Sequence, residues 1–275
     1  MSKDSLGDRM KNYESITRTS LIPKVPTVIR LDGKAFHTYT KRFKRPYDDV
    51  LINAMDETAI YLCNKIQGAK FAYVQSDEIT IAISDMDSIE SQMWYDGNIQ
   101  KITSVSASMA TVAFNRFMIL NEMMDSALNS RDIDKLLADT SIMQFAEFDS
   151  RVFQVPTIDE LINCVLWRQQ DATRNSIASV AQSLYSPKEL HGVSCDQMQE
   201  LIFQKGTNWN DLDPKLKRGR FIDKVTYING VDLRTIPLQE IPLPSTSRTK
   251  WESVECPVFS QDRNFIHQRI KNNLL

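Results

Sequence analysis

The stretch KFAYVQSDEITIAI, residues 70–83, decides the fold. β-Branched and aromatic residues dominate both of its halves, and Ile79, Ile81 and Ile83 alternate along the second half as they would on a half-buried strand. The polar residues between the halves, 75–77, are typical of a tight turn. The stretch therefore predicts two antiparallel strands joined by a turn that carries Asp77.

The flanking segments extend this pair into a larger unit. The run TVIRLD, residues 27–32, predicts a strand, and apolar residues at helical spacing predict a helix over 50–66. Downstream, a mostly apolar helix is expected over 99–128 and a further strand over 151–155. Strand, helix, strand, strand, helix, strand is the order of the split βαβ, or ferredoxin-like, arrangement.

This topology brings two distant carboxylates together. Right-handed crossovers make the first two strands parallel, with the third lying antiparallel between them. The end of the first strand then lies beside the start of the third. Asp32 ends the first strand and Asp77 opens the third, so we expect both side chains at one edge of the sheet.

The chain as a whole is expected to be an α+β protein in two parts. Residues 1–155 are expected to form the βαββαβ part, and residues 156–275 a helix and a less regular C-terminal extension. Thr157 and Glu160 have the spacing of a capping box at the start of that helix. Further helix is expected over 195–204, and a hairpin around residues 229–230.

Composition excludes several classes. The chain is 42% hydrophobic and 25% charged, as in ordinary globular proteins, and has no apolar run long enough to span a membrane. Its four cysteines are scattered without a C-x-x-C pair, which favours a reducing, cytoplasmic setting over a disulfide framework or a zinc knuckle. The net charge of −2 means that any RNA binding depends on local basic patches.

The two aspartates suit magnesium chemistry. Mg²⁺ takes one or two carboxylates together with phosphate and water oxygens, and a pair of ions can activate a hydroxyl and stabilise a leaving pyrophosphate. Gly33 offers a carbonyl and a close backbone approach, and Lys34 to His37 can surround a triphosphate. Glu78 points away from Asp77 along the strand and is a weaker ligand candidate. Ordinary turns at Asp32-Gly33 and Ser76-Asp77 remain the alternative explanation.

Six segments resemble the tRNA-His guanylyltransferase family, and most closely its guanylyltransferase-like branch of 3′-to-5′ polymerases. They occur in family order between residues 6 and 219, and the combination is far more specific than any one of them. They read LGDRMKNYE (6–14), RLDGKAFHTYTKRF (30–43), YVQSDEIT (73–80), FDSRVFQVP (148–156), WRQQDATRN (167–175) and GTNWNDLDPKLKRG (206–219).

The resemblance implies that residues 1–155 form a catalytic palm domain like that of forward polymerases and nucleotide cyclases. It also implies that residues 156–275 contribute to RNA binding and to assembly into a homotetramer. It implies that two Mg²⁺ ions are held by Asp32, the Gly33 carbonyl and Asp77, and that Glu78 supports this acidic pair. The nucleotide triphosphate would be bound by Asp32, Gly33, Lys34, Ala35, Phe36, His37, Ser76, Asp77 and Lys101.

The implied reaction builds RNA at its 5′ end. ATP activates a 5′-monophosphate as an adenylylated end, and the 3′-hydroxyl of an incoming GTP or other nucleotide attacks that end and releases AMP. A 5′-triphosphate end skips the activation. The substrate is a tRNA, for which we expect contacts from Arg168, Asn175, Lys217 and Arg218.

One departure bears on specificity. Eukaryotic members follow W-R-Q-x-D with His-Ile-Asn-Asn, whereas here the segment after Asp171 is ATRN, with Thr173 in place of the histidine. This favours template-dependent repair of 5′-truncated tRNA over the addition of a single guanosine to tRNA-His, which stays the alternative.

Two other functions are compatible with parts of the pattern. A nucleotide cyclase would use the same palm geometry without RNA, but has no need of the WRQQD and KLKRG segments. A non-catalytic RNA-binding module would not need the acidic pair, Asp32 and Asp77, which is intact here.

Overall fold

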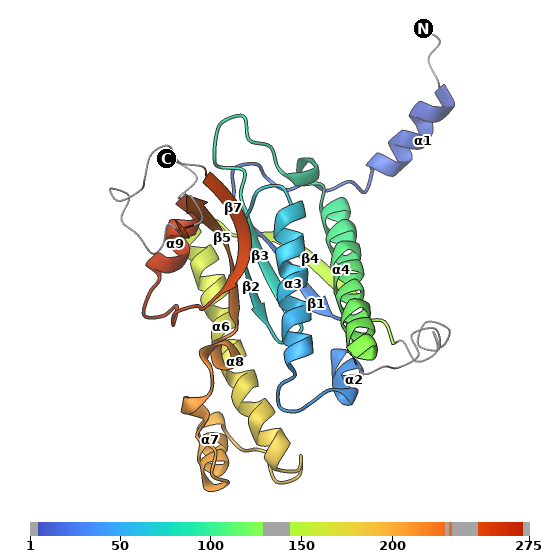
Figure 1. Cartoon of the computed structure of the whole chain (residues 1–275). Coiled ribbons are helices and arrows are strands. Elements are labelled where there is room, and N and C mark those ends of the chain that lie inside the picture. The colour runs from blue at the N-terminus through green and yellow to red at the C-terminus, as the bar shows by residue number, and fades with distance from the viewer. Residues whose placement is uncertain (1–4, 129–143, 229–230, 233–246, 272–275) are drawn as a thin grey trace.

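One sheet with helices on both faces organises the chain, and its described strand pairs are all antiparallel (Figure 1). The computed structural model describes residues 5–128, 144–228, 231–232 and 247–271. The strands run in the order β4-β1-β3-β2-β5-β6, and β7 pairs with β5 off this path. Their bounds are β1 (Thr27–Gly33), β2 (Ala69–Gln75), β3 (Glu78–Ile83), β4 (Phe148–Gln154), β5 (Arg220–Ile228), β6 (Val231–Asp232) and β7 (Ser247–Val254).

The first four strands have the predicted order. β3 pairs antiparallel with both β1 and β2, so β1 and β2 are parallel with β3 between them. β4 pairs antiparallel with the outer side of β1. Together with α3 (Asp49–Lys65) and α4 (Ile99–Leu128), these strands follow the order βαββαβ.

Side-chain alternation divides the sheet between two cores. Ile29, Leu31, Ile79 and Ile81 point towards α3 and α4, where they join a cluster that also contains Phe114. The residues between them along the strands point the other way, towards α6 (Ile158–Leu184) and α9 (Asn264–Lys271). Each strand therefore has one set of side chains for each face, as the period of two requires.

The face towards α6 holds the second core. Val28, Phe71, Tyr73, Ala82 and Phe221 pack there against apolar residues of α6 and α9. α6 begins at a cap in which the Thr157 side chain accepts from the backbone N–H of Glu160, as the sequence predicts.

Short elements surround the ends of the sheet. α1 (Ser5–Ser15) has no buried residue and projects from the body in Figure 1. α7 (Cys195–Gln204) packs on the far end of α6, and α8 (Pro214–Arg218) leads into β5. The remaining elements are α2 (Phe36–Tyr39) and the 3-10 turns η1 (Thr40–Arg42), η2 (Trp94–Gly97) and η3 (Trp209–Asp211).

The C-terminal part is more regular than expected. β5 pairs with β2 and along its length with β7, so it extends the sheet that residues 1–155 begin. The sequence predicted only the end of β5 that belongs to the expected hairpin, and it did not predict β7, because polar residues interrupt the apolar pattern of both strands. The expected helix over 195–204 is confirmed as α7. β5 and β6 pair on either side of residues 229–230, which lie outside the described residues. Within the described ranges, no helix is long and apolar enough to cross a bilayer.

Candidate active site

The predicted pair of aspartates lies at one end of the sheet. Asp32 stands opposite Glu78 in the β1–β3 ladder, and the Gly33 N–H donates to the Asp77 carbonyl at 3.1 Å. Burial raises the pKa of the Asp77 carboxyl, and the nearby Asp32 carboxylate raises it further. The two acidic groups are therefore close enough to repel each other, a cost that a shared cation would relieve.

A third carboxylate adds to this negative potential. Asp149 stands opposite Asp32 in the β1–β4 ladder. Burial and then Asp149 raise the pKa of Asp32, whereas Arg151 lowers it. The Arg151 guanidinium lies 3.7 Å from an Asp32 oxygen and 3.4 Å from an Asp149 oxygen, so it only partly neutralises the group.

This donor set fits Mg²⁺ better than metals that need a complete protein cage. Among the described residues there is no group of three or more His, Cys, Asp or Glu side chains arranged to hold a metal. Mg²⁺ uses one or two carboxylates and takes its other oxygens from phosphate, water or backbone carbonyls. Asp32, Asp77 and the Gly33 carbonyl are the groups that would hold such an ion.

Glu78 has a different environment from the aspartates. Arg168 of α6 donates from Nε to Glu78 Oε1 and from Nη2 to Oε2, both at 2.7 Å. Both side chains are buried. Arg168 also donates to Asp171 at 2.8 Å. The bidentate pair joins the start of β3 to α6, and so holds the end of the strand that directly follows Asp77.

The loop after β1 is set by close packing. A Cβ on Gly33 would lie 2.1 Å from a ring carbon of Phe36, so only glycine fits there. Phe36 is buried against Phe114 and Phe148, and it anchors the loop. Lys34 is exposed and pairs with Glu147 at 2.5 Å. Ala35 has a left-handed backbone with φ 54° at the start of α2.

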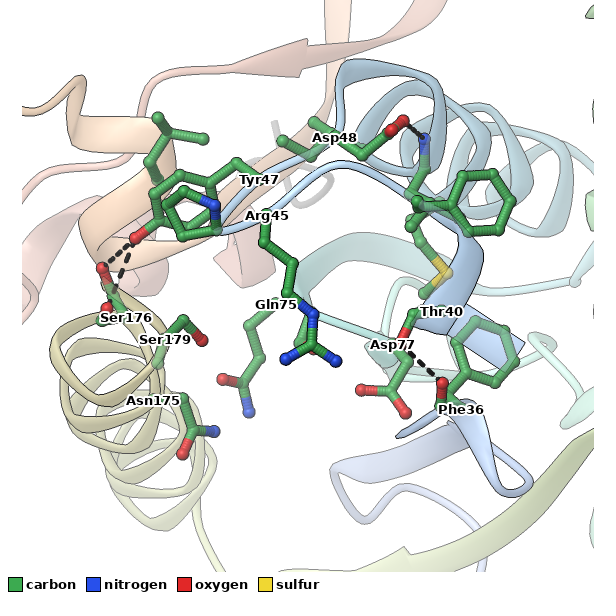
Figure 2. A pocket seen from close by; sticks show the side chains of 18 of the residues that line it. Phe36, Thr40, Arg45, Tyr47, Asp48, Gln75, Asp77, Asn175, Ser176 and Ser179 are labelled. Atoms are coloured by element: carbon green, nitrogen blue, oxygen red, sulfur yellow. Dashed lines mark hydrogen bonds between the residues drawn. The ribbon is translucent and has the colours of Figure 1, made fainter. Parts of the chain in front are cut away.

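A pocket of about 470 Å³ opens beside Asp77 (Figure 2). It spans the end of the sheet between α3 and α6, with Asp77 on one side and Asn175, Ser176 and Ser179 on the other. Its apolar and aromatic lining comes from Phe36, Phe43, Tyr47, Leu51 and Met55, and its cationic groups are Lys44, Arg45, Lys215 and Arg220.

The pocket contains some of the predicted nucleotide residues and several that were not predicted. Of the predicted nucleotide residues, Phe36, His37, Ser76 and Asp77 line it, whereas those of the segment 32–35 do not. Asn175, which we expected to contact RNA, lines it as well. The missed lining residues are Arg45, Tyr47, Gln75, Ser176 and Arg220. They come from four separate segments, so only the tertiary structure places them together. Arg45 ends a basic run, KRFKR over residues 41–45, and this run is the sequence feature that could have indicated it.

A hydrogen-bond network stabilises the α6 side of the pocket. Tyr47 Oη and Ser176 Oγ lie 2.7 Å apart, and Trp209 Nε1 donates to the same Ser176 oxygen at 3.0 Å. The loop before α3 is thereby joined to α6 and to η3, and the pocket wall is held in one arrangement.

The other predicted residues lie outside this pocket. Lys101 is in the first turn of α4, at the opposite end of the sheet, and its ammonium lies 4.6 Å from the centroid of the Tyr95 ring. Lys217 is buried, and its Nζ donates to the Asn210 carbonyl at 2.5 Å. The Arg168 guanidinium forms ion pairs with Glu78 and Asp171, and Arg218 is half-buried in α8. Within one chain, the structure does not bring these four together.

Comparison with known proteins identifies the family. The model of the family "Thg1: tRNAHis guanylyltransferase" matches residues 7–156, which include the acidic pair and the loop after β1. The chain belongs to this family. It is a nucleotidyltransferase of the Thg1 type, as the six sequence segments predicted.

Relatives of the Thg1 family match nearly the whole chain. A bacterial Thg1-like protein solved in complex with ATP is 39% identical, with a TM-score of 0.78 over 97% of this chain and 99% of that one. A bacterial Thg1-like protein in complex with GTP is 37% identical, with a TM-score of 0.74 and the same coverage. An uncharacterized protein of Acanthamoeba polyphaga mimivirus is 29% identical over 80% of this chain and 77% of its own. The likeness to bacterial Thg1-like proteins agrees with the branch predicted from the sequence.

The segment that departs from eukaryotic Thg1 enzymes lies on α6 beside the pocket. Asn175, which the two patterns share, lines the pocket. Thr173 occupies the position of the histidine in the family pattern that the sequence resembles, and its hydroxyl donates to the Gln169 carbonyl at 3.0 Å. The hydroxyl is used within the helix, and threonine has no imidazole.

Proposed function

We propose that this protein is a Mg²⁺-dependent 3′-to-5′ nucleotidyltransferase that repairs 5′-truncated tRNA by adding template-paired nucleotides. The observation that carries the proposal is that Asp32 lies near Asp77 at one end of the sheet, where Asp77 lines a pocket large enough for a nucleotide. The bacterial Thg1-like proteins solved with ATP and GTP support the choice of ligands.

Each residue near the acidic pair has a role in this proposal. Asp32, Asp77 and the Gly33 carbonyl hold two Mg²⁺ ions, which when bound neutralise the triphosphate and favour ionisation of the attacking hydroxyl. The loop from Lys34 to His37, with Ser76, surrounds the triphosphate. Glu78 positions β3 through its pair with Arg168.

The RNA approaches over the pocket rim. Lys44, Arg45 and Lys215 place positive charge there. Asn175 of α6 lines the pocket as well. Residues 156–275 supply much of this surface, and Arg218 lies next to it in α8. The same part and α4 serve assembly into a homotetramer. Exposed Val112, Leu120 and Met124 along α4 give that helix an apolar surface for a second copy.

The addition of one guanosine to tRNA-His is the alternative within the family. Thr173 disfavours it, because the pattern of the tRNA-His enzymes has histidine at this position, and the Thr173 hydroxyl is bonded within α6. A non-catalytic RNA-binding module would gain nothing from the mutually repelling Asp32 and Asp77. A cyclase would not require the basic rim of the pocket.

The test is extension of a tRNA that lacks its first nucleotide, with Mg²⁺ and labelled nucleotides. We expect Asp32→Ala and Asp77→Ala each to slow extension by about a thousandfold, because losing metal stabilisation costs several kcal/mol. Asp196→Ala, an exposed carboxylate on α7, is the matched control and should extend normally. Full activity in either site variant would refute the metal assignment. A product one guanosine long on every template would favour the alternative.

A further inference from the structure

Two buried polar groups in the pocket lack a hydrogen-bond partner. They are Oε1 of Gln75 and Nη2 of Arg220, and in the part of the chain that the structure describes no other buried side-chain nitrogen or oxygen is unpartnered. Gln75 is 4% exposed and Arg220 is 6% exposed. Because burying an unpaired polar group costs about 1–3 kcal/mol, two such groups facing one pocket indicate a missing ligand.

The structure holds the Arg220 side chain in place while leaving one nitrogen free. Its Nε donates to Asp56 Oδ1 at 2.5 Å, and Ser253 donates to the other Asp56 oxygen at 2.8 Å. Asp56 lies in α3, so the guanidinium is fixed by an element outside its own strand. The remaining amine is oriented before any ligand binds, which lowers the cost of binding.

Gln75 and Arg220 approach the pocket from opposite faces of the sheet. Arg220 is paired with Val74 in the β2–β5 ladder, so its side chain lies on the α3 face, and Gln75 is the next residue along β2. Both line the pocket, which reaches across the sheet end from α3 to α6. Figure 2 shows the Gln75 amide between Asn175 and Asp77.

The chemistry of the two groups selects the ligand. A phosphate would satisfy Arg220 but would place its negative oxygens against the carbonyl oxygen of Gln75. A nucleobase offers N–H donors and ring or carbonyl acceptors on one flat ring, and the pocket walls Phe43, Tyr47 and Leu51 suit such a ring. We propose that Gln75 accepts from an N–H of the base of the bound nucleotide and that Arg220 donates to an acceptor on that base.

This inference rests on the proposed function, because it takes the pocket to hold a nucleoside triphosphate with its phosphates towards Asp77. In ATP, the 6-amino group is a donor for Gln75, and a ring nitrogen is an acceptor for Arg220. Purine riboside triphosphate has the same ring and phosphates without the amino group. Comparing the two nucleotides therefore measures the contact of the amino group by itself.

The first test is calorimetric binding of ATP, purine riboside triphosphate and inorganic tripolyphosphate to the full chain. We expect the unmodified protein to bind ATP about tenfold more tightly than purine riboside triphosphate, the size of one buried hydrogen bond. In Gln75→Leu the two nucleotides should bind about equally tightly, with the tripolyphosphate Kd unchanged. Gln75→Glu should keep the roughly tenfold preference for ATP. Gln67→Leu, at the other end of β2, is the matched control. The proposal would be overturned if Gln75→Leu still preferred ATP over purine riboside triphosphate about tenfold. It would also be overturned if Gln75→Leu bound tripolyphosphate more weakly by the same factor as ATP.

The second test addresses Arg220. Arg220→Lys keeps a cation for Asp56 but removes the guanidinium fork, so we expect about a tenfold weaker ATP Kd with a Tm close to that of the parent protein. A 5′-monophosphorylated RNA should bind Arg220→Lys and Gln75→Leu as tightly as it binds the parent protein. If instead the variants bind the RNA more weakly and ATP as tightly as the parent, the base that contacts Gln75 and Arg220 is part of the RNA, and the proposal fails. The tRNA extension assay is independent, because a failure to extend would sink the proposed function while leaving the ATP ratios intact.

Discussion

Asp77 combines burial with a neighbouring negative charge, and this has a consequence for stability. Because both factors raise the pKa of its carboxyl above the ordinary 3.8, the folded chain binds the proton more tightly than the unfolded chain does. Stability is therefore lost as the pH rises through the shifted pKa. Without Mg²⁺, Asp77→Asn should have a higher Tm than the parent at pH 7, and the gain should vanish below pH 3.8. Thermal unfolding in EDTA measures this, with Asp196→Asn as the unaffected control. A Tm gain that is independent of pH would contradict the assignment.

Arg168 and Arg174 both pair with Asp171, but only Arg168 is buried and also holds Glu78. Arg168→Ala leaves the buried Glu78 carboxylate unpaired, so we expect a loss of about 3–5 kcal/mol in the free energy of unfolding. Arg174→Ala removes an exposed pair and should cost at most about 1 kcal/mol. Urea denaturation separates the two. Equal losses would show that the Glu78 pair does not stabilise the fold.

The junction between α8 and β5 depends on Gly219. Its φ is 76°, and a Cβ there would lie 2.5 Å from Tyr73 Oη and 2.7 Å from the Val74 carbonyl oxygen. Gly206, after α7, has φ 82° but nothing within 4 Å. Gly206→Ala should therefore cost only the backbone strain, about 1–2 kcal/mol, and Gly219→Ala about 2–5 kcal/mol because it adds overpacking. Denaturant unfolding of both variants tests the difference. Similar losses in the free energy of unfolding would mean that Tyr73 and β2 shift to accommodate the new methyl group at little cost.

The whole molecule has a net charge of −2, so any affinity for RNA must come from a local surface. Lys215 lies at the pocket rim, whereas Lys65 is exposed at the end of α3 far from it. Lys215→Gln should reduce the slope of log Kd for tRNA against log salt by about one, and Lys65→Gln should leave it unchanged. Binding titrations at several salt concentrations give the slopes. An equal effect of both would mean that RNA binds without a preferred face.

The central fold was predicted from local patterns of apolar residues in the sequence. The alternating isoleucines of β3 and the helical spacing of apolar residues in α3 identified these elements, because solvent and core impose those periods directly on the sequence. β5 and β7 escaped this reading. β5 pairs with β2 across about 146–150 residues, and β7 pairs only with β5. Such pairing between distant strands leaves little trace in local composition.

The sequence by itself determined the family, the order of the central strands and the meeting of Asp32 with Asp77, since handed crossovers permit few topologies. Only the tertiary structure decided which groups line the pocket. Gln75, Arg220 and Ser176 belong to segments whose contact depends on how α6 and β5 pack against the sheet end. The same packing buried Arg168 and Lys217, because the partners of a charged side chain are set by its neighbours in space and not by its neighbours in the chain.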